Sequence, residues 1–381
     1  MSDDFLPFSK PSISDEAIAE VVACLKSGWI TTGPRTARFA ELLQDYFPTK
    51  HALTVSSGTA GLHLALLGLD LSPGDEVITS SLTFVASLNT IVQAGGKPVL
   101  VDINPNTRNM DVNLLEAAIT PKTRAIMPVH FAGQPVDLEP LYEIAKKHNL
   151  RVIEDAAQAI GSEYHGKRIG SFGDTQVFSF HPNKNLTTGE GGCVTTTDDE
   201  LAKHISVMRF HGIDRDAFNR FSKDGSQAYD VIAPGHKYNM LDMQAALGIH
   251  QLPALETFIE KRTALAMRYY EKLGEIKALS LPECPPKDVM HNWHLFTVYV
   301  DPKIISRDDF MLKLKENNIG SGLHYEAVHL YSYYQKNYGF KVGDFPHAER
   351  ASKEIVSLPL FPDMTTDEQD RVIQTIKQIT Q

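Results

Sequence analysis

The sequence has few cysteines, no long apolar run and no excess of basic residues. Its three cysteines, Cys24, Cys193 and Cys284, lie far apart and form no CxxC pair, which excludes a disulfide scaffold and indicates a reducing compartment. The absence of any run of 18 apolar residues and the acidic N-terminal start argue against a membrane span and a secretory signal. A formal net charge of -10 argues against nucleic acid or an anionic membrane as the main partner. We therefore expect a cytoplasmic protein.

Metal-binding patterns are also missing. The 15 histidines are scattered, and neither HExxH nor a Cys/His cluster with zinc spacing occurs, so we expect no metal. What is present is ordinary globular composition over 381 residues, with 42% hydrophobic and 22% charged residues. This length and composition indicate about two domains with a sizeable core.

Between about residues 50 and 250, short β-branched runs alternate with longer helical patterns. Several runs are continuously apolar, as expected for strands that are covered on both faces. The pattern predicts a mainly parallel sheet with helical crossovers. The predicted strands are 51–55, 76–79, 98–102, 125–129, 151–154 and 175–180.

After about residue 251 the pattern changes. We expect an α/β chain with a large domain over residues 1–250 and a smaller α+β domain over residues 251–381. The elements predicted for the smaller domain are a long amphipathic helix over 253–273, a strand over 294–300, a helix over 307–317, a strand over 320–325 and a last helix from Thr366.

One lysine, Lys184, follows a buried strand and enters a turn rich in Gly and Thr. Burial disfavours the ammonium form and lowers a lysine pKa, so a free amine that attacks aldehydes becomes available near neutral pH. Lys184 is therefore a candidate Schiff-base nucleophile. The alternative is that Lys184 is one of many solvated lysines. Only neighbouring residues suited to a cofactor would favour the nucleophile over this alternative.

Polar residues that follow other predicted strands provide such partners, because the carboxyl ends of parallel strands share one edge. Ser57, Gly58 and Thr59 open a helix after the first strand, and a helix N-terminus with hydroxyls suits a phosphate. The alternative is an ordinary N-cap at Ser57. Ser179, five residues before Lys184, can add its hydroxyl to the same phosphate.

The edge also receives an acid and an aromatic ring. Asp155 ends the strand 151–155 and can keep a pyridinium protonated, or else cap the next helix. Gln158, one turn later, reaches the same ring or packs, and Phe84 stacks on the ring or belongs to the core. Phosphate site, ring acid and lysine together are the contacts that pyridoxal 5'-phosphate (PLP) needs. Their joint occurrence favours a PLP site.

Seven short motifs are spread over nearly the whole chain: GWITTGP at 28–34, SSGTA at 56–60, IEDAAQ at 153–158, FSFHPNK at 178–184, GEGG at 189–192, KYN at 237–239 and SLPLFP at 357–362. With them the chain resembles the DegT/DnrJ/EryC1/StrS sugar aminotransferases, which are fold type I PLP-dependent transferases. The resemblance implies that Lys184 carries the internal aldimine and shuttles protons, that Asp155 pairs with the pyridine nitrogen, and that Gln158 lies by the ring hydroxyl. The residues implied to hold the phosphate are Gly58, Thr59 and Ser179.

The resemblance also implies a homodimer, in which Asn239 reaches the cofactor phosphate of the neighbouring subunit. The implied reaction moves the amino group of L-glutamate, through the pyridoxamine form (PMP), to a nucleotide-linked 4-keto sugar. The residues expected to contact that sugar nucleotide are Thr31, Thr32, Arg209, His211, His324 and Tyr325.

Within the family, stretches such as 27–34, 320–325 and 358–365 are similar to members that make UDP-4-amino-4-deoxy-L-arabinose for lipid A modification. Phe84, Gln158 and the 182–183 pair depart from those members, which have Trp, His and Ala-Ile there, and Gln158 and Pro182 look more like the wider family. Two other interpretations are a sugar 3-dehydratase, in which a histidine replaces the lysine, and a non-catalytic sensor or assembly protein. Lys184 argues against the first, and the intact set of cofactor residues argues against the second. The keto sugar, its nucleotide and the choice between C3 and C4 amination stay open.

Overall fold

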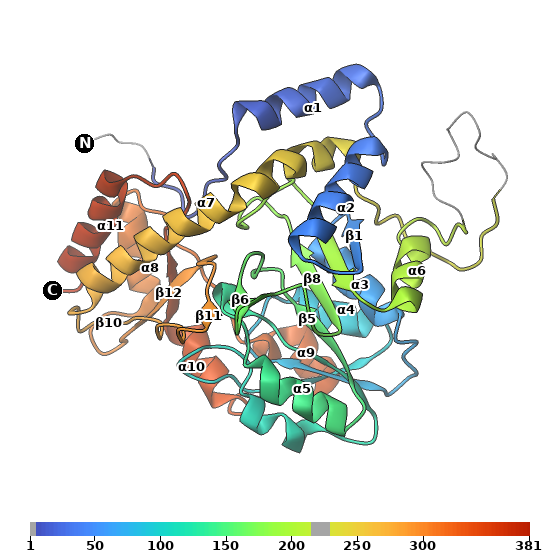
Figure 1. Cartoon of the computed structure of the whole chain (residues 1–381). Coiled ribbons are helices and arrows are strands. Elements are labelled where there is room, and N and C mark those ends of the chain that lie inside the picture. The colour runs from blue at the N-terminus through green and yellow to red at the C-terminus, as the bar shows by residue number, and fades with distance from the viewer. Residues whose placement is uncertain (1–4, 215–228) are drawn as a thin grey trace.

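A seven-stranded sheet forms the centre of the larger part of the molecule (Figure 1). The computed structural model describes residues 5–214 and 229–381. β9 runs antiparallel to both of its neighbours, and every other pair in the sheet is parallel. The predicted mainly parallel sheet is confirmed, but β9 was not predicted. In spatial order the strands are β1 (His51–Val55), β9 (Gly192–Thr196), β8 (Thr175–Ser179), β5 (Arg151–Asp155), β4 (Thr123–Met127), β2 (Glu76–Ser80) and β3 (Lys97–Val101).

Helices cover both faces of this sheet because successive strand residues point to opposite sides. On β5, Val152 joins a core shared with α2, α5 and α7, whereas Ile153 joins a core shared with α3, α4 and α6. This double burial explains the continuous apolar runs. The six helices are α2 (Pro34–Tyr46), α3 (Gly58–Leu67), α4 (Ala86–Gln93), α5 (Leu138–Lys147), α6 (Asp199–Met208) and α7 (Asp242–Leu273).

The C-terminal part has its own antiparallel sheet and its own core. The sheet consists of β10 (Leu279–Ser280), β12 (Phe296–Val300) and β13 (Ile355–Leu358), in that order. Its core contains buried residues of β12, β13, α8 (Arg307–Glu316), α11 (Thr366–Ile379) and the last turns of α7. α7 runs continuously across residue 250, and the division of the chain there stays a prediction.

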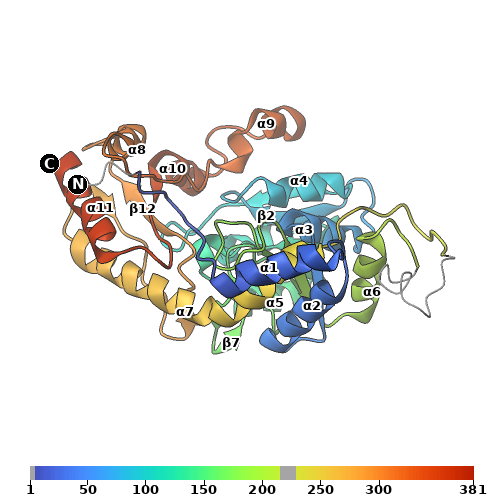
Figure 2. The same ribbon diagram turned by 90° about the horizontal axis from the view of Figure 1, so that it is seen from above.

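Short elements connect the two parts. β11 (Val289–Met290) pairs with β6 (Glu163–Tyr164), which also pairs with β7 (Lys167–Arg168). α9 (Ser332–Tyr338) lies beside α4 (Figure 2), and the Tyr334 hydroxyl of α9 donates to Asn89 Oδ1 of α4 at 2.5 Å. α10 (Pro346–Glu354) leads into β13, and α1 (Asp15–Ser27) packs on α7.

One predicted helix began too late, and one predicted strand was wrong. The helix predicted over 253–273 is confirmed in that range, but it begins earlier, at Asp242, and Pro253 lies inside it. A proline usually ends a helix, but α1 and α2 both pack along α7 and offset the lost hydrogen bond. The strand predicted over 320–325 is a single bridge between Gly322 and Ser357, because the chain then leaves the sheet and brings Tyr325 to the edge of the parallel strands, where its hydroxyl bonds to Gln158.

Candidate active site

A cavity of about 400 Å³ opens beyond the carboxyl ends of β2, β5 and β8. Loops that follow separate strands meet here, as the parallel topology requires. Nine of the residues predicted from the sequence line it, namely Gly58, Thr59, Phe84, Asp155, Gln158, Ser179, Lys184, His324 and Tyr325.

Lys184 reaches this cavity from the turn that follows β8. Burial lowers the pKa of its amine to about 8, although the nearby Asp155 carboxylate acts in the opposite direction. Its Nζ lies 3.4 Å from Nε2 of His294. Near neutral pH a substantial fraction of Lys184 is therefore the neutral amine.

Asp155 ends β5 and is only 5% exposed. Its carboxylate accepts hydrogen bonds from the Ser87 hydroxyl at 2.7 Å and from the Ala157 N–H at 3.2 Å. Burial raises the pKa of Asp155, while these hydrogen bonds and the Lys184 amine oppose the rise. No helix begins in the turn that follows Asp155, so the helix-capping interpretation of this residue was wrong.

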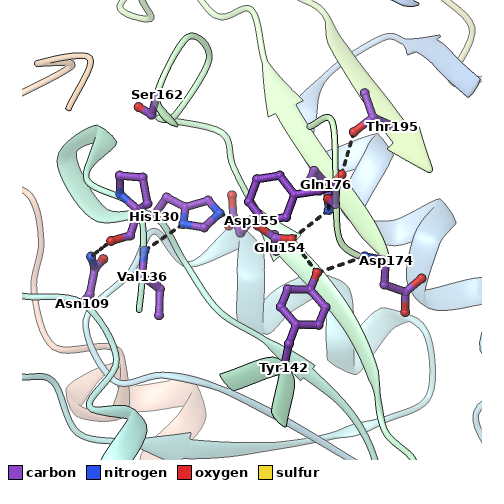
Figure 3. Close-up of polar contacts among 12 residues, drawn as sticks. Asn109, His130, Val136, Tyr142, Glu154, Asp155, Ser162, Asp174, Gln176 and Thr195 are labelled. Atoms are coloured by element: carbon purple, nitrogen blue, oxygen red, sulfur yellow. Dashed lines mark hydrogen bonds and ion pairs between the residues drawn. The ribbon is translucent and has the colours of Figure 1, made fainter. Parts of the chain in front are cut away.

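The neighbouring residue Glu154 does not line the cavity, and its carboxylate belongs to a separate network (Figure 3). It accepts hydrogen bonds from His130 Nε2 at 2.8 Å, the Tyr142 hydroxyl at 2.6 Å and Gln176 Nε2 at 2.7 Å. The other nitrogen of His130 accepts a backbone N–H, so Nε2 carries the proton. Successive residues of a strand point to opposite faces. The Glu154 carboxylate therefore stabilises the fold through its hydrogen bonds, whereas the Asp155 carboxylate faces the cavity.

The anion-binding end of α3 depends on two glycines. Ser57 is the N-cap, and its Oγ accepts the Ala60 N–H at 3.1 Å. A Cβ added to Gly58 would lie 2.9 Å from Ser179 Cβ, and one added to Gly192 would lie 2.8 Å from Gly58 N. The absence of both side chains brings the Ser179 hydroxyl against the positive end of α3. This packing of Gly192 was not predicted from the sequence.

Phe84 and Tyr325 form the aromatic side of the cavity. Phe84 is 55% exposed, so the interpretation that places it in the core was wrong. Its ring centroid lies 5.9 Å from that of Tyr325. Gln158 is fixed between the two parts of the chain, because its Oε1 accepts the Ala132 N–H at 2.8 Å and its Nε2 donates to the Tyr325 hydroxyl at 3.0 Å.

His324 is neutral, since burial and the Lys184 charge lower its pKa to about 3. Its Nδ1 lies 2.8 Å from the Ser357 hydroxyl. Four polar lining residues were missed by sequence reasoning, although two of them flank Pro182 in the Lys184 motif, a signal that was available. The four are Thr83, His181, Asn183 and Glu190.

Five predicted residues do not line this cavity in their own chain. Asn239 donates to the Thr32 hydroxyl at 2.6 Å, and Thr32 in turn donates to the Met240 carbonyl. Arg209 donates to the Thr54 carbonyl at 2.7 Å. The residues outside the cavity are Thr31, Thr32, Arg209, His211 and Asn239.

Within residues 5–214 and 229–381, no group of three or more His, Cys, Asp or Glu side chains is placed to hold a metal ion. Nor does any helix there have the length and apolar character needed to cross a membrane.

The charges around the cavity match one cofactor. Asp155 is a buried carboxylate that a pyridinium N–H would neutralise, the start of α3 suits a phosphate, and the Lys184 amine suits an aldehyde. PLP carries all three groups, and the glycine-lined approach of α3 to Ser179 provides space for the phosphate. The fold and the cavity therefore define a PLP-dependent enzyme of fold type I.

Comparison with known proteins specifies the class further. The model of the DegT/DnrJ/EryC1/StrS aminotransferase family matches residues 11–377, and the chain belongs to this family. The spore coat polysaccharide biosynthesis protein SpsC of Bacillus subtilis is 46% identical over 98% of this chain and 97% of its own. The UDP-4-amino-4-deoxy-L-arabinose--oxoglutarate aminotransferase of Shewanella sediminis is 43% identical over 100% of this chain and 99% of its own.

A solved structure gives the same result. A Streptococcus pneumoniae protein, provisionally named a sugar aminotransferase and solved in its PMP form, superimposes with a TM-score of 0.92 at 34% identity, covering 98% of this chain and 99% of its own. The same protein has also been solved in its PLP form. This chain is thus a PLP-dependent sugar aminotransferase.

Proposed function

We propose that this enzyme transfers the amino group of L-glutamate to the keto carbon of a nucleotide-linked 4-keto sugar, a UDP-4-keto-pentose or a related keto-deoxysugar. The observation that carries the proposal is the Lys184 amine, with a pKa of about 8, in a cavity that also contains the Asp155 carboxylate. The names of the Bacillus and Shewanella relatives, which refer to polysaccharide synthesis and to oxoglutarate, support the substrate class. The product then serves cell-surface polysaccharide or lipid A.

Lys184 has two tasks in this proposal. Bound PLP supplies an aldehyde that exchanges amino groups and a ring that withdraws electrons. The Lys184 amine would hold that aldehyde. Once free, it would move a proton from the donor carbon to the cofactor's aldehyde carbon in the glutamate half-reaction, and from that carbon to the sugar carbon in the second half-reaction. A pKa of about 8 suits both directions of transfer, because the amine and the ammonium are both populated near neutral pH.

The mouth of the cavity provides the contacts for the sugar. The Tyr325 hydroxyl accepts a hydrogen bond from Gln158, so its own proton can be donated to a sugar oxygen. The exposed ring of Phe84 offers an apolar face to the sugar or to the cofactor ring. His324 stays neutral and acts through hydrogen bonds rather than charge.

The substrate proposal is tested with a panel of UDP-, GDP- and dTDP-linked keto sugars, with L-glutamate as donor. We expect stoichiometric 2-oxoglutarate release with a 4-keto sugar and a product whose mass shows that an amino group has replaced the keto oxygen. A product that has instead lost water would identify a dehydratase. If glutamate changes neither the absorbance of the bound cofactor nor the 2-oxoglutarate concentration, the proposal is wrong.

We also propose a homodimer in which Asn239 serves the partner's site. Asn239 is buried, and within the described parts of the chain its Oδ1 has no hydrogen-bond partner. α1 exposes an apolar stripe formed by Ile18, Val22 and Leu25, which are 52%, 41% and 52% exposed. An exposed stripe of this spacing is typical of a helix that packs on another surface. Both observations support contact with a second copy.

A hybrid dimer tests this arrangement. We expect light scattering to give twice the chain mass of 42.3 kDa. When chains with Lys184→Ala and Asn239→Asp are co-expressed under different tags, each hybrid keeps one site with an intact lysine and the partner's intact Asn239. Purified hybrids should therefore have about half of the wild-type activity, whereas both homodimers are impaired. A monomeric mass, or hybrids no better than the Asn239→Asp homodimer, would contradict the arrangement.

A further inference from the structure

His294 comes from the C-terminal part of the chain but lies against the lysine of the large sheet. It is 3% exposed, and its Nε2 is 3.4 Å from Lys184 Nζ. Its Nδ1 is buried and has no hydrogen-bond partner within residues 5–214 and 229–381. Within those residues, the hydrogen bonds of the imidazole side chain are therefore limited to the contact with Lys184.

The turn that carries His294 is tied to both catalytic loops. Asn292 donates from Nδ2 to the carbonyls of Gln158 and Ile160, both at 2.8 Å, and accepts the His294 N–H at Oδ1 at 3.0 Å. The Asn292 carbonyl accepts Asn185 Nδ2 at 2.7 Å, and Asn185 follows Lys184 directly. These bonds fix the turn relative to the loops that carry Asp155 and Lys184.

Arg262 of α7 also forms hydrogen bonds with this turn. It is 1% exposed, and its Nη1 donates to the carbonyls of Trp293 at 3.2 Å, His294 at 3.3 Å and Leu360 at 3.0 Å. A guanidinium buried against three carbonyls is a costly arrangement, and it restricts the backbone of His294 tightly. The position of the imidazole is therefore set before any ligand binds.

We propose that His294 is the positioning residue for Lys184. His294 accepts a hydrogen bond from the lysine amine whenever that amine is not bound to the cofactor. The charged and titratable groups around the pair are Lys184, Arg262, His291 and His324 on the side of His294, and Asp155 on the side of Lys184. Burial, with the positive charges of Lys184 and Arg262, holds the pKa of His294 far below its usual range, so the ring is neutral. A neutral Nε2 accepts the Lys184 proton and directs the amine toward one place in the cavity.

This inference rests on the role proposed for Lys184, so its test uses the amine itself rather than sugar turnover. In the cofactor-free full-length chain, the pH dependence of Lys184 acetylation, read by mass spectrometry, gives the pKa of the amine. A hydrogen bond to the ammonium form raises a lysine pKa. We therefore expect His294→Phe to lower the pKa of Lys184 by about one unit, and His294→Gln, which keeps an acceptor, to restore most of this shift.

His291 is the matched control. It lies in the same turn, is 6% exposed and stacks on Trp293 at 4.1 Å, but its ring forms no hydrogen bond with Lys184. His291→Phe should lower the melting temperature without changing the pKa of Lys184. If His294→Phe does not fold, His294→Met removes the acceptor with a more adaptable side chain. An unchanged Lys184 pKa in the acceptor-free variant, or an equal shift in His291→Phe, overturns the proposal.

The glutamate half-reaction of the holoenzyme provides the second measurement. We expect the loss of His294 to lower the single-turnover rate about tenfold with little change in the glutamate concentration for half-saturation, because orientation and not binding is lost. A rate equal to that of wild type would overturn the proposal. Loss of sugar turnover alone, with a normal glutamate half-reaction and the expected shift in pKa, would contradict the substrate proposal and leave this one standing.

Discussion

Replacement of Lys184 by alanine should lower the rate of the glutamate half-reaction by about 10⁴-fold. In the proposed reaction, the variant loses both the amine that captures the cofactor aldehyde and the group that moves the proton. Single-turnover absorbance measurements on the variant reconstituted with cofactor give this rate directly. Lys303→Ala is the matched control, because Lys303 is an exposed lysine and its loss should leave the rate unchanged.

The pH dependence of cofactor capture gives the same prediction a sharper form. Burial lowers the pKa of Lys184 to about 8, so about a quarter of the amine is neutral at pH 7.5, compared with about one part in a thousand for an unperturbed lysine. The protonated amine cannot attack, so capture by the cofactor-free chain should rise with pH and level off above about pH 8. A rate that still rises tenfold between pH 8.5 and 9.5 would mean that Lys184 behaves as a solvated lysine.

Asp155→Asn should be the second most damaging change, with a loss of about 10²–10³-fold in the same half-reaction. Asparagine fills the same volume and can still accept the Ser87 hydrogen bond, but it lacks the negative charge that keeps a pyridinium nitrogen protonated. The bound cofactor should therefore change its absorbance and lose reactivity while the chain stays folded. The half-reaction rate and the melting temperature together distinguish these effects.

Glu154→Gln is the control for that experiment. Glu154 is the preceding residue on the same strand, is 1% exposed, and bonds to His130, Tyr142 and Gln176 away from the cavity. Its neutralisation should lower the free energy of unfolding, because buried donors lose a charged acceptor, while the folded fraction keeps its half-reaction. If Glu154→Gln slows the chemistry as much as Asp155→Asn does, the assignment of separate roles to the two carboxylates is wrong.

Sequence patterns predicted those elements whose structure depends on residues close together in the sequence. Continuous apolar runs gave the doubly covered strands, and Ser57 was recognised as a helix cap because the cap depends only on the next three residues. β9 was missed because its five residues, Gly192–Thr196, follow a Gly-rich segment and return antiparallel instead of through a crossover helix. The start of α7 was missed because a proline inside the helix is tolerated only through packing that the sequence does not show.

The candidate site divides in the same way. Asp155 ends one strand and Lys184 follows another, so their meeting could be predicted from the topology of a parallel sheet. His294 lies 110 residues after Lys184 and reaches it only through a turn fixed by Asn292 and Arg262. Asn239 and Thr32 are separated by 207 residues in the sequence, and they form a hydrogen bond outside the cavity. Contacts of this kind arise from tertiary structure and leave no periodic signal.

α7 has a consequence for how substrate preference can change during evolution. Its 32 residues, about 48 Å of helix, contribute side chains to the cores of both parts of the molecule. The two parts therefore cannot rotate relative to each other unless α7 bends. Arg262, near the middle of α7, donates hydrogen bonds to the turn beside Lys184. The turn beside Lys184 is thus held by hydrogen bonds in which neither Phe84 nor Tyr325 takes part. Substitutions around Phe84 and Tyr325 can select a new sugar while the amine, the acid and their spacing are inherited unchanged.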